Sequence, residues 1–112
     1  MTRSFISAQI FDKRWAEFGL GDEDLRKLQN FLMKKSNAGD IIQGTGGLRK
    51  LRWRLPNTGK SGGIRVLYID FIRQEKIMLA NCYAKSEKDN ITDKEKDMYR
   101  EFVKMIGKEL EE

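Results

Sequence analysis

The segment 48–55 alternates between two kinds of side chain, and this alternation constrains the fold more than any other feature of the chain. Apolar residues occupy one set of positions and basic residues the other: Leu51, Trp53 and Leu55, against Lys50, Arg52 and Arg54. Successive side chains of a β-strand point to opposite faces of a sheet. The pattern therefore predicts a strand with one face on a hydrophobic core and a basic face turned away from it.

The periodicity of the remaining chain predicts the other elements. Further strands are expected at 3–6, 64–72 and 76–85, with helices at 7–18, 22–36 and 92–109. Segment 64–72 is apolar on both faces apart from Arg65 and Asp70, as expected of a central strand. The sum is an α+β fold, with an N-terminal helical hairpin, an antiparallel β-sheet meander and a C-terminal helix. The length of 112 residues favours a single domain spanning 1–112.

The expected helices begin at polar residues that are suited to capping. Ser7 and Asp22 are expected to accept hydrogen bonds from the first backbone N–H groups of their helices. Thr92 and Glu95 have the spacing of a capping box. In the last helix, the spacing of Tyr99 and its apolar neighbours predicts that this tyrosine lies in the core.

The residue types that the chain lacks exclude several classes of function. There is no histidine and a single cysteine, Cys82. These counts exclude a Ser-His-Asp triad, a Cys-His dyad and zinc sites built from His or Cys, so no metal or cofactor is expected. There is no apolar run of about 18 residues and no N-terminal signal sequence, so we expect a cytoplasmic protein without a membrane span.

The positive charge of the chain is concentrated in segment 41–69. This segment holds six of the 22 basic residues and none of the 17 acidic ones, so the remainder has 16 basic against 17 acidic residues. On a solvated face the two signs are usually mixed, because neighbouring like charges repel each other. A solvated face remains the alternative, but the clustering favours a surface that binds phosphates.

Segment 56–63 is a glycine-rich connection that contains Gly59-Lys60-Ser61, similar to the end of a phosphate-binding P-loop. The full motif needs a glycine at position 54, where the chain has Arg54, and a helix after the loop, where a strand is expected. Nucleoside triphosphate binding is therefore rejected. The glycines of this connection, and those at 44, 46 and 47, are better explained by turns.

A basic face of this kind binds RNA, and with suitable neighbours it can also cleave RNA. Cleavage by attack of the 2′-hydroxyl requires a proton acceptor near that oxygen, a proton donor at the leaving oxygen and positive charge at the phosphate. Arginine holds phosphate through two parallel hydrogen bonds, whereas lysine can transfer protons. The residues alone leave binding and cleavage open, because basic faces bind RNA more often than they cleave it.

Three blocks, in this order, resemble the RelE/HigB family of toxins from bacterial toxin–antitoxin pairs, and the HigB branch most. They are Gly44-Thr-Gly-Gly-Leu-Arg-Lys-Leu-Arg52, then Gly63-Ile-Arg-Val-Leu-Tyr68, then Tyr83-Ala-Lys-Ser-Glu87. The resemblance spans residues 3–106 and implies a RelE-like microbial ribonuclease fold. It also implies a metal-independent, ribosome-dependent endoribonuclease that cuts translated mRNA by 2′-hydroxyl attack and so inhibits translation and growth.

Carried over by position, the resemblance implies a set of catalytic residues: Lys50, Arg52, Arg65, Tyr83 and Lys85. Of these, Lys50 or Lys85 is expected to transfer protons. The two arginines are expected to stabilise the phosphorane, the five-coordinate phosphorus of the reaction.

Outside this set, the chain offers residues for binding RNA or rRNA: Arg49, Arg54 and Lys60. Glu87 either orients Lys85 or pairs with Lys88 in solvent.

The same resemblance implies several partners. The first is a cognate antitoxin, in the HigB branch often with a helix-turn-helix domain, through which the toxin reaches operator DNA. The ribosome with its rRNA, and the translated mRNA, are the others. Two alternatives remain open from the sequence: a non-catalytic module that binds RNA or the ribosome, and an inactive toxin homologue that acts with its antitoxin in transcriptional autoregulation.

Overall fold

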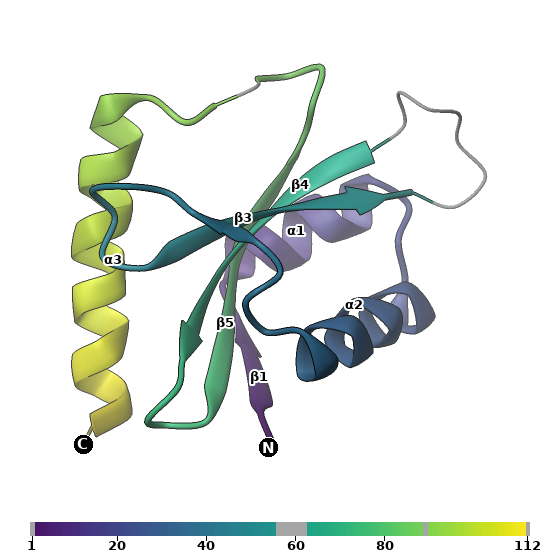
Figure 1. The fold of residues 1–112 in the computed structure, drawn as a ribbon. Coiled ribbons are helices and arrows are strands. Elements are labelled where there is room, and N and C mark those ends of the chain that lie inside the picture. Colours follow the sequence, from purple (N-terminus) through teal and green to yellow (C-terminus); the bar gives the residue numbers. More distant parts are fainter. Residues whose placement is uncertain (1, 56–62, 89, 112) are drawn as a thin grey trace.

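The computed structural model describes residues 2–55, 63–88 and 90–111 (Figure 1). These residues form, in chain order, β1 Ser4–Ser7, α1 Gln9–Glu17, α2 Asp22–Lys34, β2 Asp40–Ile41, β3 Leu48–Arg54, β4 Gly63–Phe71, β5 Lys76–Ala84 and α3 Asp93–Glu111. The predicted α+β fold is confirmed, and each predicted helix and strand is present. None of the described helices is long and apolar enough to cross a membrane.

The strands join one sheet in the order β1-β5-β4-β3-β2. Strands β2 to β5 form the predicted antiparallel meander. The sequence left the pairing of the first strand open, and β1 pairs parallel to β5 with Ser4 opposite Lys76. Only strands joined by a tight hairpin are bound to be antiparallel, and most of the chain separates these two. β4 is the central strand, as its apolar sequence predicts.

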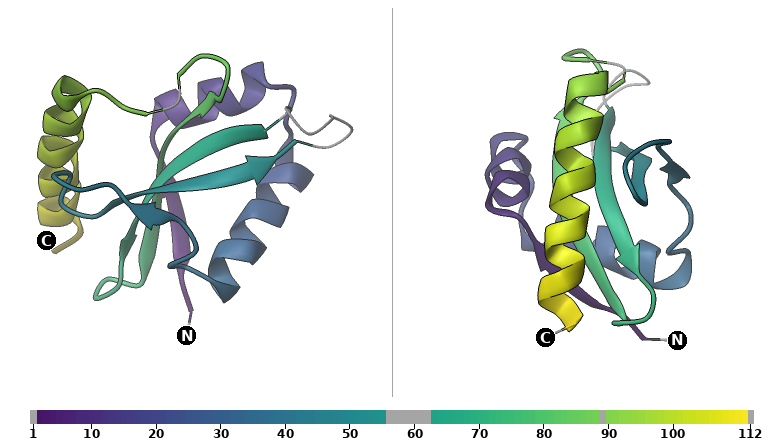
Figure 2. Two further views of the ribbon diagram at one scale, coloured as in Figure 1. Left: turned by 45° about the horizontal axis from the view of Figure 1, so that its top comes forward. Right: turned by 90° about the vertical axis from the view of Figure 1, so that its left-hand side faces the viewer.

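The helices pack on opposite faces of this sheet (Figure 1, Figure 2). On one face α1 and α2 contribute buried residues of the helical hairpin: Phe11, Trp15, Leu28 and Leu32. On the other face α3 contributes Tyr99, Val103 and Ile106. The predicted core position of Tyr99 is therefore confirmed. β4 supplies residues to both cores, so it is covered on both sides.

Strand β3 directs its two kinds of side chain to opposite faces, as its alternation predicts. Leu51, Trp53 and Leu55 join the core under α1 and α2, where the Trp53 ring lies 5.6 Å from that of Phe31. The basic positions alternate with them and lie on the α3 face. There Leu48 packs under α3 at the start of the strand. Further along the strand, Arg52 and Arg54 are exposed.

The helix starts differ from the prediction at two of three places. Ala8, not Ser7, is the N-cap of α1, and Gly21, not Asp22, is the N-cap of α2. The N–H of Gly21 donates to the Asp24 carboxylate at 3.0 Å. An acidic side chain within the first turn of α2 therefore accepts a hydrogen bond from the backbone at the helix start, as in a capping box. The predicted Thr92–Glu95 capping box is confirmed, with N···O distances of 2.9 and 3.1 Å.

The turn that leads from β2 into β3 explains the glycines that precede the basic strand. Gly46 and Gly47 have φ angles of 76° and 122°, in the left-handed region that favours glycine. Between β2 and β3, the buried Thr45 hydroxyl donates to the Ile42 carbonyl at 2.6 Å and accepts from the Leu48 N–H at 3.1 Å. The turn interpretation is confirmed for this group. Gly59 and Lys60 lie outside the described residues.

A buried tyrosine anchors the connection between α2 and β2. Tyr68 donates its hydroxyl proton to the Ser36 carbonyl at 2.7 Å and accepts from the Gly39 N–H at 2.9 Å. A side chain at Gly39 would lie 2.8 Å from the Tyr68 ring, so the backbone can approach only because this residue is glycine. The two-residue strand β2, which the sequence did not predict, depends on this anchor.

Replacing Tyr68 with phenylalanine is expected to destabilise the fold by about 1–3 kcal/mol, because a backbone N–H and a carbonyl lose their partner. Urea unfolding measures the difference. Tyr99→Phe is the matched control in the other core, since Tyr99 has a single described hydrogen bond, accepted from Asn81. We expect a smaller loss there, and equal losses would contradict the anchoring role of Tyr68.

Candidate functional site

Three of the predicted site residues form one row across the sheet. Arg52 on β3 lies directly opposite Arg65 on β4, and Arg65 lies opposite Tyr83 on β5. Arg65 alternates with residues of the α1/α2 core, and Tyr83 belongs to the α3 core, so the row lies on the α3 face. Antiparallel pairing therefore brings together residues separated by as many as 31 positions in the chain.

The two arginines of the row have no acidic partner among the described residues. The ion pairs of this part of the chain involve other basic residues: Arg3, Arg14, Lys88, Lys96, Arg100 and Lys104. Arg65 is only 6% exposed, whereas Arg52 is exposed. Two arginines thus occupy directly opposite positions on adjacent strands, and one of them is largely withdrawn from water.

The same strand shows how the chain neutralises a buried charge elsewhere. Asp70, near the other end of β4, is paired with Arg3 at 2.8 Å, and both side chains are almost fully buried. Asp70 raises the pKa of Arg3, first through the hydrogen bond between them. No such partner is provided for Arg65 within the described residues. An unpaired buried charge beside a like charge costs stability, so this arrangement is suited to binding an anion rather than to holding the fold.

Lys50 lies beside the row on the same face. It is opposite Leu67 in the register, and its ammonium donates to the Asn90 side-chain oxygen at 2.9 Å. Asn90 belongs to the connection between β5 and α3, so this hydrogen bond ties that connection to β3. Asn90 could not be identified from the sequence, because the contact joins residues 40 positions apart.

Tyr83 forms the buried end of the row. Its ring is 3% exposed and packs in the α3 core. The ammonium of Lys88 lies 5.2 Å from the ring centroid, and Lys88 also pairs with Glu95 of α3. The ring is therefore placed between the arginine row and a further cation that the sequence did not single out.

Lys85 is exposed at the first position after β5. It sits in a turn that is closed twice, because the Glu87 N–H donates to the Ala84 carbonyl at 3.0 Å and the Ala84 N–H donates to the Glu87 carboxylate at 3.0 Å. Of the two sequence interpretations of Glu87, the pair with Lys88 was wrong. Glu87 pairs with Arg14 of α1, and Lys88 pairs with Glu95 instead.

Arg14 is a functional candidate that the sequence did not reveal. Its guanidinium donates to the Cys82 carbonyl at 3.3 Å, pairs with Glu87 and lies over the Phe18 ring at 5.0 Å. The Ala84 N–H, and then Arg14, hold the pKa of Glu87 below its ordinary value. Helical spacing within α1 could not have shown this contact, because its partners lie on β5 and in the following turn.

The remaining predicted RNA-binding residues are placed differently. Arg54 is exposed at the end of β3, on the face of the row. Arg49 lies opposite Tyr68 and so on the α2 face, where its guanidinium donates to the carbonyls of Asn37 and Gly39 at 3.3 and 2.7 Å. The structure thus separates Arg49 from the row. Lys60 lies outside the described residues.

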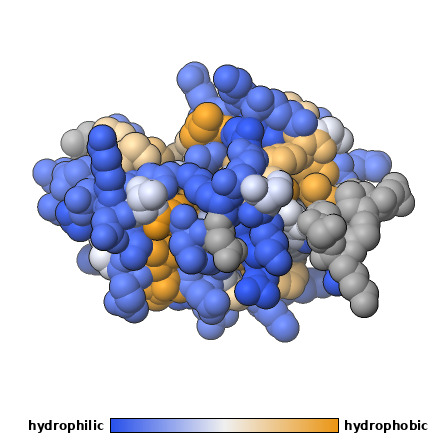
Figure 3. Space-filling view, turned by 90° about the horizontal axis from the view of Figure 1, so that it is seen from above, coloured by the Kyte–Doolittle hydropathy of each residue, from blue (hydrophilic) through white to orange (hydrophobic). Residues whose placement is uncertain are grey.

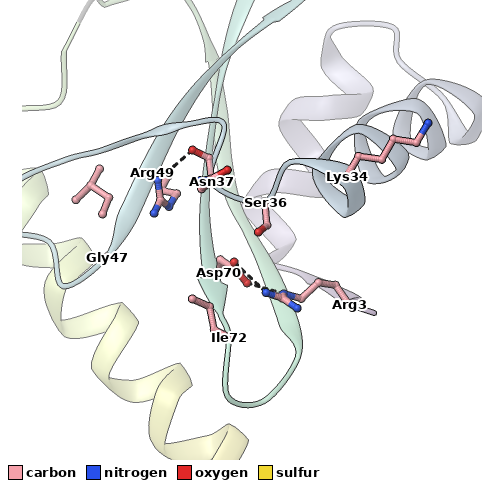
Figure 4. Close-up of a pocket in the computed structure, with 9 residues that line it drawn as sticks. Arg3, Lys34, Ser36, Asn37, Gly47, Arg49, Asp70 and Ile72 are labelled. Atoms are coloured by element: carbon pink, nitrogen blue, oxygen red, sulfur yellow. Dashed lines mark hydrogen bonds and ion pairs between the residues drawn. The ribbon is translucent and has the colours of Figure 1, made fainter. Parts of the chain in front are cut away.

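Arg49 lines a pocket of about 440 Å³ on the face of the sheet that carries α2 (Figure 4). The Arg3–Asp70 pair and Ile72 are further lining residues, and the side chain of Lys34 extends away from the Arg3–Asp70 pair (Figure 4). The buried charges of this pocket are paired with each other, and Arg49 is hydrogen-bonded to two carbonyls. The polar groups of the pocket therefore stabilise the fold. The row on the other face is the better candidate for chemistry.

The end of the molecule where β5 stops and α3 begins is largely hydrophilic, with apolar patches between the polar side chains (Figure 3). No group of three or more His, Cys, Asp or Glu side chains with metal-site geometry occurs among the described residues. Burial raises the pKa of the Cys82 thiol to about 12, so it is not a nucleophile at neutral pH. The chemistry available here is that of arginine, lysine and tyrosine.

Two comparisons with known proteins bear on the family and the fold. A family model described as the RelE toxin of the RelE/RelB toxin–antitoxin system matches residues 4–112. Among solved structures, the chain is similar to a double arginine-to-alanine mutant of the E. coli toxin RelE in the free state, with 16% sequence identity and a TM-score of 0.57. That match covers 80% of this chain and 90% of the other, and at this identity it supports the fold.

The pair formed by Arg14 and Glu87 is expected to stabilise the fold at neutral pH and to be lost in acid. The pKa of Glu87 is lowered in the folded state, so its contribution is present above the unfolded value of about 4.3 and disappears as the pH falls through the folded pKa. A double-mutant cycle with Arg14→Gln and Glu87→Gln, followed by urea unfolding, measures the coupling.

We expect a coupling energy below about 1 kcal/mol at neutral pH, because the pair is partly exposed, and none at about pH 2. A coupling that stays constant over this range would contradict the assigned pair.

Proposed function

The chain belongs to the RelE toxin family, the toxins of toxin–antitoxin systems, and we propose that it acts by cutting mRNA on the ribosome. Toxins of this family are in general endoribonucleases that act on ribosomes and are paired with antitoxins. The reaction that we propose is attack of an RNA 2′-hydroxyl on the adjacent phosphate, without a metal ion. Membership of the HigB branch is part of the proposal.

The observation that carries this proposal is the pairing of Arg52 with Arg65 in the absence of an acidic partner among the described residues. In the reaction, the phosphorane gathers negative charge on its non-bridging oxygens. Guanidinium groups that are already in place stabilise this charge without having to reorganise. Arg65 is fixed within the central strand, so it holds one position, whereas the exposed Arg52 is free to follow the RNA backbone.

Proton transfer falls to the lysines beside the row. Lys85 is exposed on a closed turn, next in sequence to the strand that carries Tyr83, so its side chain is open to an approaching RNA. Lys50 is held by Asn90, which supports a positioning or charge role as well as proton transfer. Tyr83 is proposed to support the reacting groups from the core under α3, where its ring is buried. The first proton acceptor is proposed to be Lys50 or Lys85.

Arg54 and Lys60 are proposed to bind RNA or rRNA beyond the reacting phosphate. Arg54 is exposed at the end of β3, where the mRNA strand would continue past Arg52. Arg49 was predicted to share this role, and its place on the other face of the sheet favours support of the α2–β2 connection instead. The proposed partners are a cognate antitoxin with a helix-turn-helix domain, which brings the toxin to operator DNA, and the ribosome with its mRNA.

Replacing Arg65 with methionine is expected to separate stability from activity. Methionine has a similar length and no charge, so the variant loses the repulsion from Arg52 and the cost of a buried cation. We expect a melting temperature equal to or above that of the wild type. Cleavage of ribosome-bound mRNA, followed by primer extension, should slow by about 100- to 1,000-fold.

Arg73→Met is the control, because Arg73 is exposed in the turn at the far end of β4. Arg65→Lys keeps the charge but loses the two-pronged geometry, so it should recover only part of the rate. If Arg65→Met cleaves at the wild-type rate, the assigned site is wrong. If the wild type binds ribosomes in a salt-dependent manner without cutting mRNA, the chain is a binding module and not a nuclease.

A further inference from the structure

Strand β5 changes its neighbour halfway along its length. β1 pairs with the first four residues of β5, from Lys76 to Leu79, and the Ala8 N–H adds one more hydrogen bond to the Leu79 carbonyl. After this point the chain turns into α1, so β1 no longer covers this edge of β5. The half of β5 that leads to Tyr83 and Lys85 therefore lies beside a helix instead of a strand.

Arg14 of α1 takes the place of the missing strand at this edge. Its guanidinium donates to the Cys82 carbonyl, a backbone acceptor that β1 would otherwise have to satisfy. The same guanidinium pairs with Glu87, whose carboxylate accepts from the Ala84 N–H. One side chain thus contacts the strand before Tyr83 and the turn after Ala84.

We propose that Arg14 is a positioning residue for Lys85, an inference that rests on the proposed nuclease function. Lys85 occupies the tip of the turn that Glu87 closes, and it has no described ion pair of its own. Its position is therefore set by the backbone, and the backbone is held by Glu87 and Arg14. Without Arg14, the carboxylate keeps one backbone bond but loses its attachment to the body of the molecule.

This role is distinct from that of Arg52 and Arg65, because Arg14 does not lie on the α3 face. Arg14 belongs to the helix that packs on the opposite face, and it reaches only the edge of β5. It acts on the reaction through the turn and touches no reacting atom. A displacement of about 1 Å in a proton-transfer group can slow a reaction by about 100-fold, so loss of this support should be visible in the rate.

The test is a kinetic double-mutant cycle on ribosome-bound mRNA with Arg14→Gln, Lys85→Gln and the double variant. We expect Arg14→Gln to lower kcat by about 10- to 100-fold with KM changed by less than about 2-fold. In the Lys85→Gln background the same substitution should have no further effect, because the group that it positions is gone.

Arg100→Gln is the matched control. Arg100 also joins a backbone carbonyl and a carboxylate, those of Gly44 and Asp97, at 3.0 and 2.9 Å, but it holds the turn before β3. Its loss should cost similar stability and leave kcat unchanged. Equal losses of kcat for Arg14→Gln and Arg100→Gln would overturn the proposal, as would effects of Arg14→Gln and Lys85→Gln that multiply, or a Lys85→Gln variant as fast as the wild type.

If Lys85→Gln cleaves too slowly to measure, hydrogen exchange decides. The amides of 84–87 should exchange faster in Arg14→Gln than in the wild type or Arg100→Gln, and unchanged exchange would overturn the proposal. A wild-type protein that cuts no mRNA would instead remove the nuclease function on which the proposal rests.

Discussion

The burial of β4 on both faces is the constraint on which the rest of the structure depends. A strand in this position has room for few charges, and this one carries two, Arg65 and Asp70. The two are treated in opposite ways. Asp70 receives a buried partner from the start of the chain, whereas Arg65 receives a second arginine as its cross-strand neighbour. Among the described residues, the fold thus neutralises the charges of β4 at only one end.

This asymmetry separates a structural end of the sheet from the end that we propose to be reactive. At the structural end, Arg3 and Asp70 neutralise each other beside the anchor that Tyr68 provides for the α2–β2 connection. At the other end, the sheet offers the guanidinium groups of Arg52 and Arg65, and side-chain contacts support the segments on either side of them. Asn90 holds Lys50 on one side, and Arg14 holds the turn after β5 on the other.

The sequence was sufficient for whatever depends on local periodicity. The alternation in β3 correctly predicted which side chains enter the core, because a strand's side chains can point only two ways. The row of Arg52, Arg65 and Tyr83 was predicted in part. The resemblance named these residues as members of one site, and the register of the strands then showed that they lie opposite one another. The Arg14 contacts and the parallel pairing of β1 could not be predicted, because each joins segments more than 60 residues apart.

Smaller errors have the same origin. Asp22 was predicted as the cap of α2, but the Asp24 carboxylate accepts the hydrogen bond from the Gly21 N–H. Both acids lie in the first turn of the helix, and the sequence does not show which of them makes this bond. Glu87 was assigned to neighbours in sequence, yet its partner comes from α1. In both cases the sequence correctly gave the kind of interaction, a carboxylate with a donor, and the fold decided which donor.

Arg52 and Arg65, which have no acidic partner among the described residues, also bear on how such a protein is controlled. Their mutual repulsion raises the free energy of the unbound protein, and any anion that binds between them recovers that energy. The phosphate of an RNA and the carboxylate of a protein partner would both relieve this repulsion when they bind. An antitoxin that places an acidic side chain at this row would therefore gain affinity from the feature proposed to serve catalysis, and it would compete directly with RNA. An antitoxin that binds elsewhere, for example against α1, would have to act indirectly, through the contacts that support the turn with Lys85.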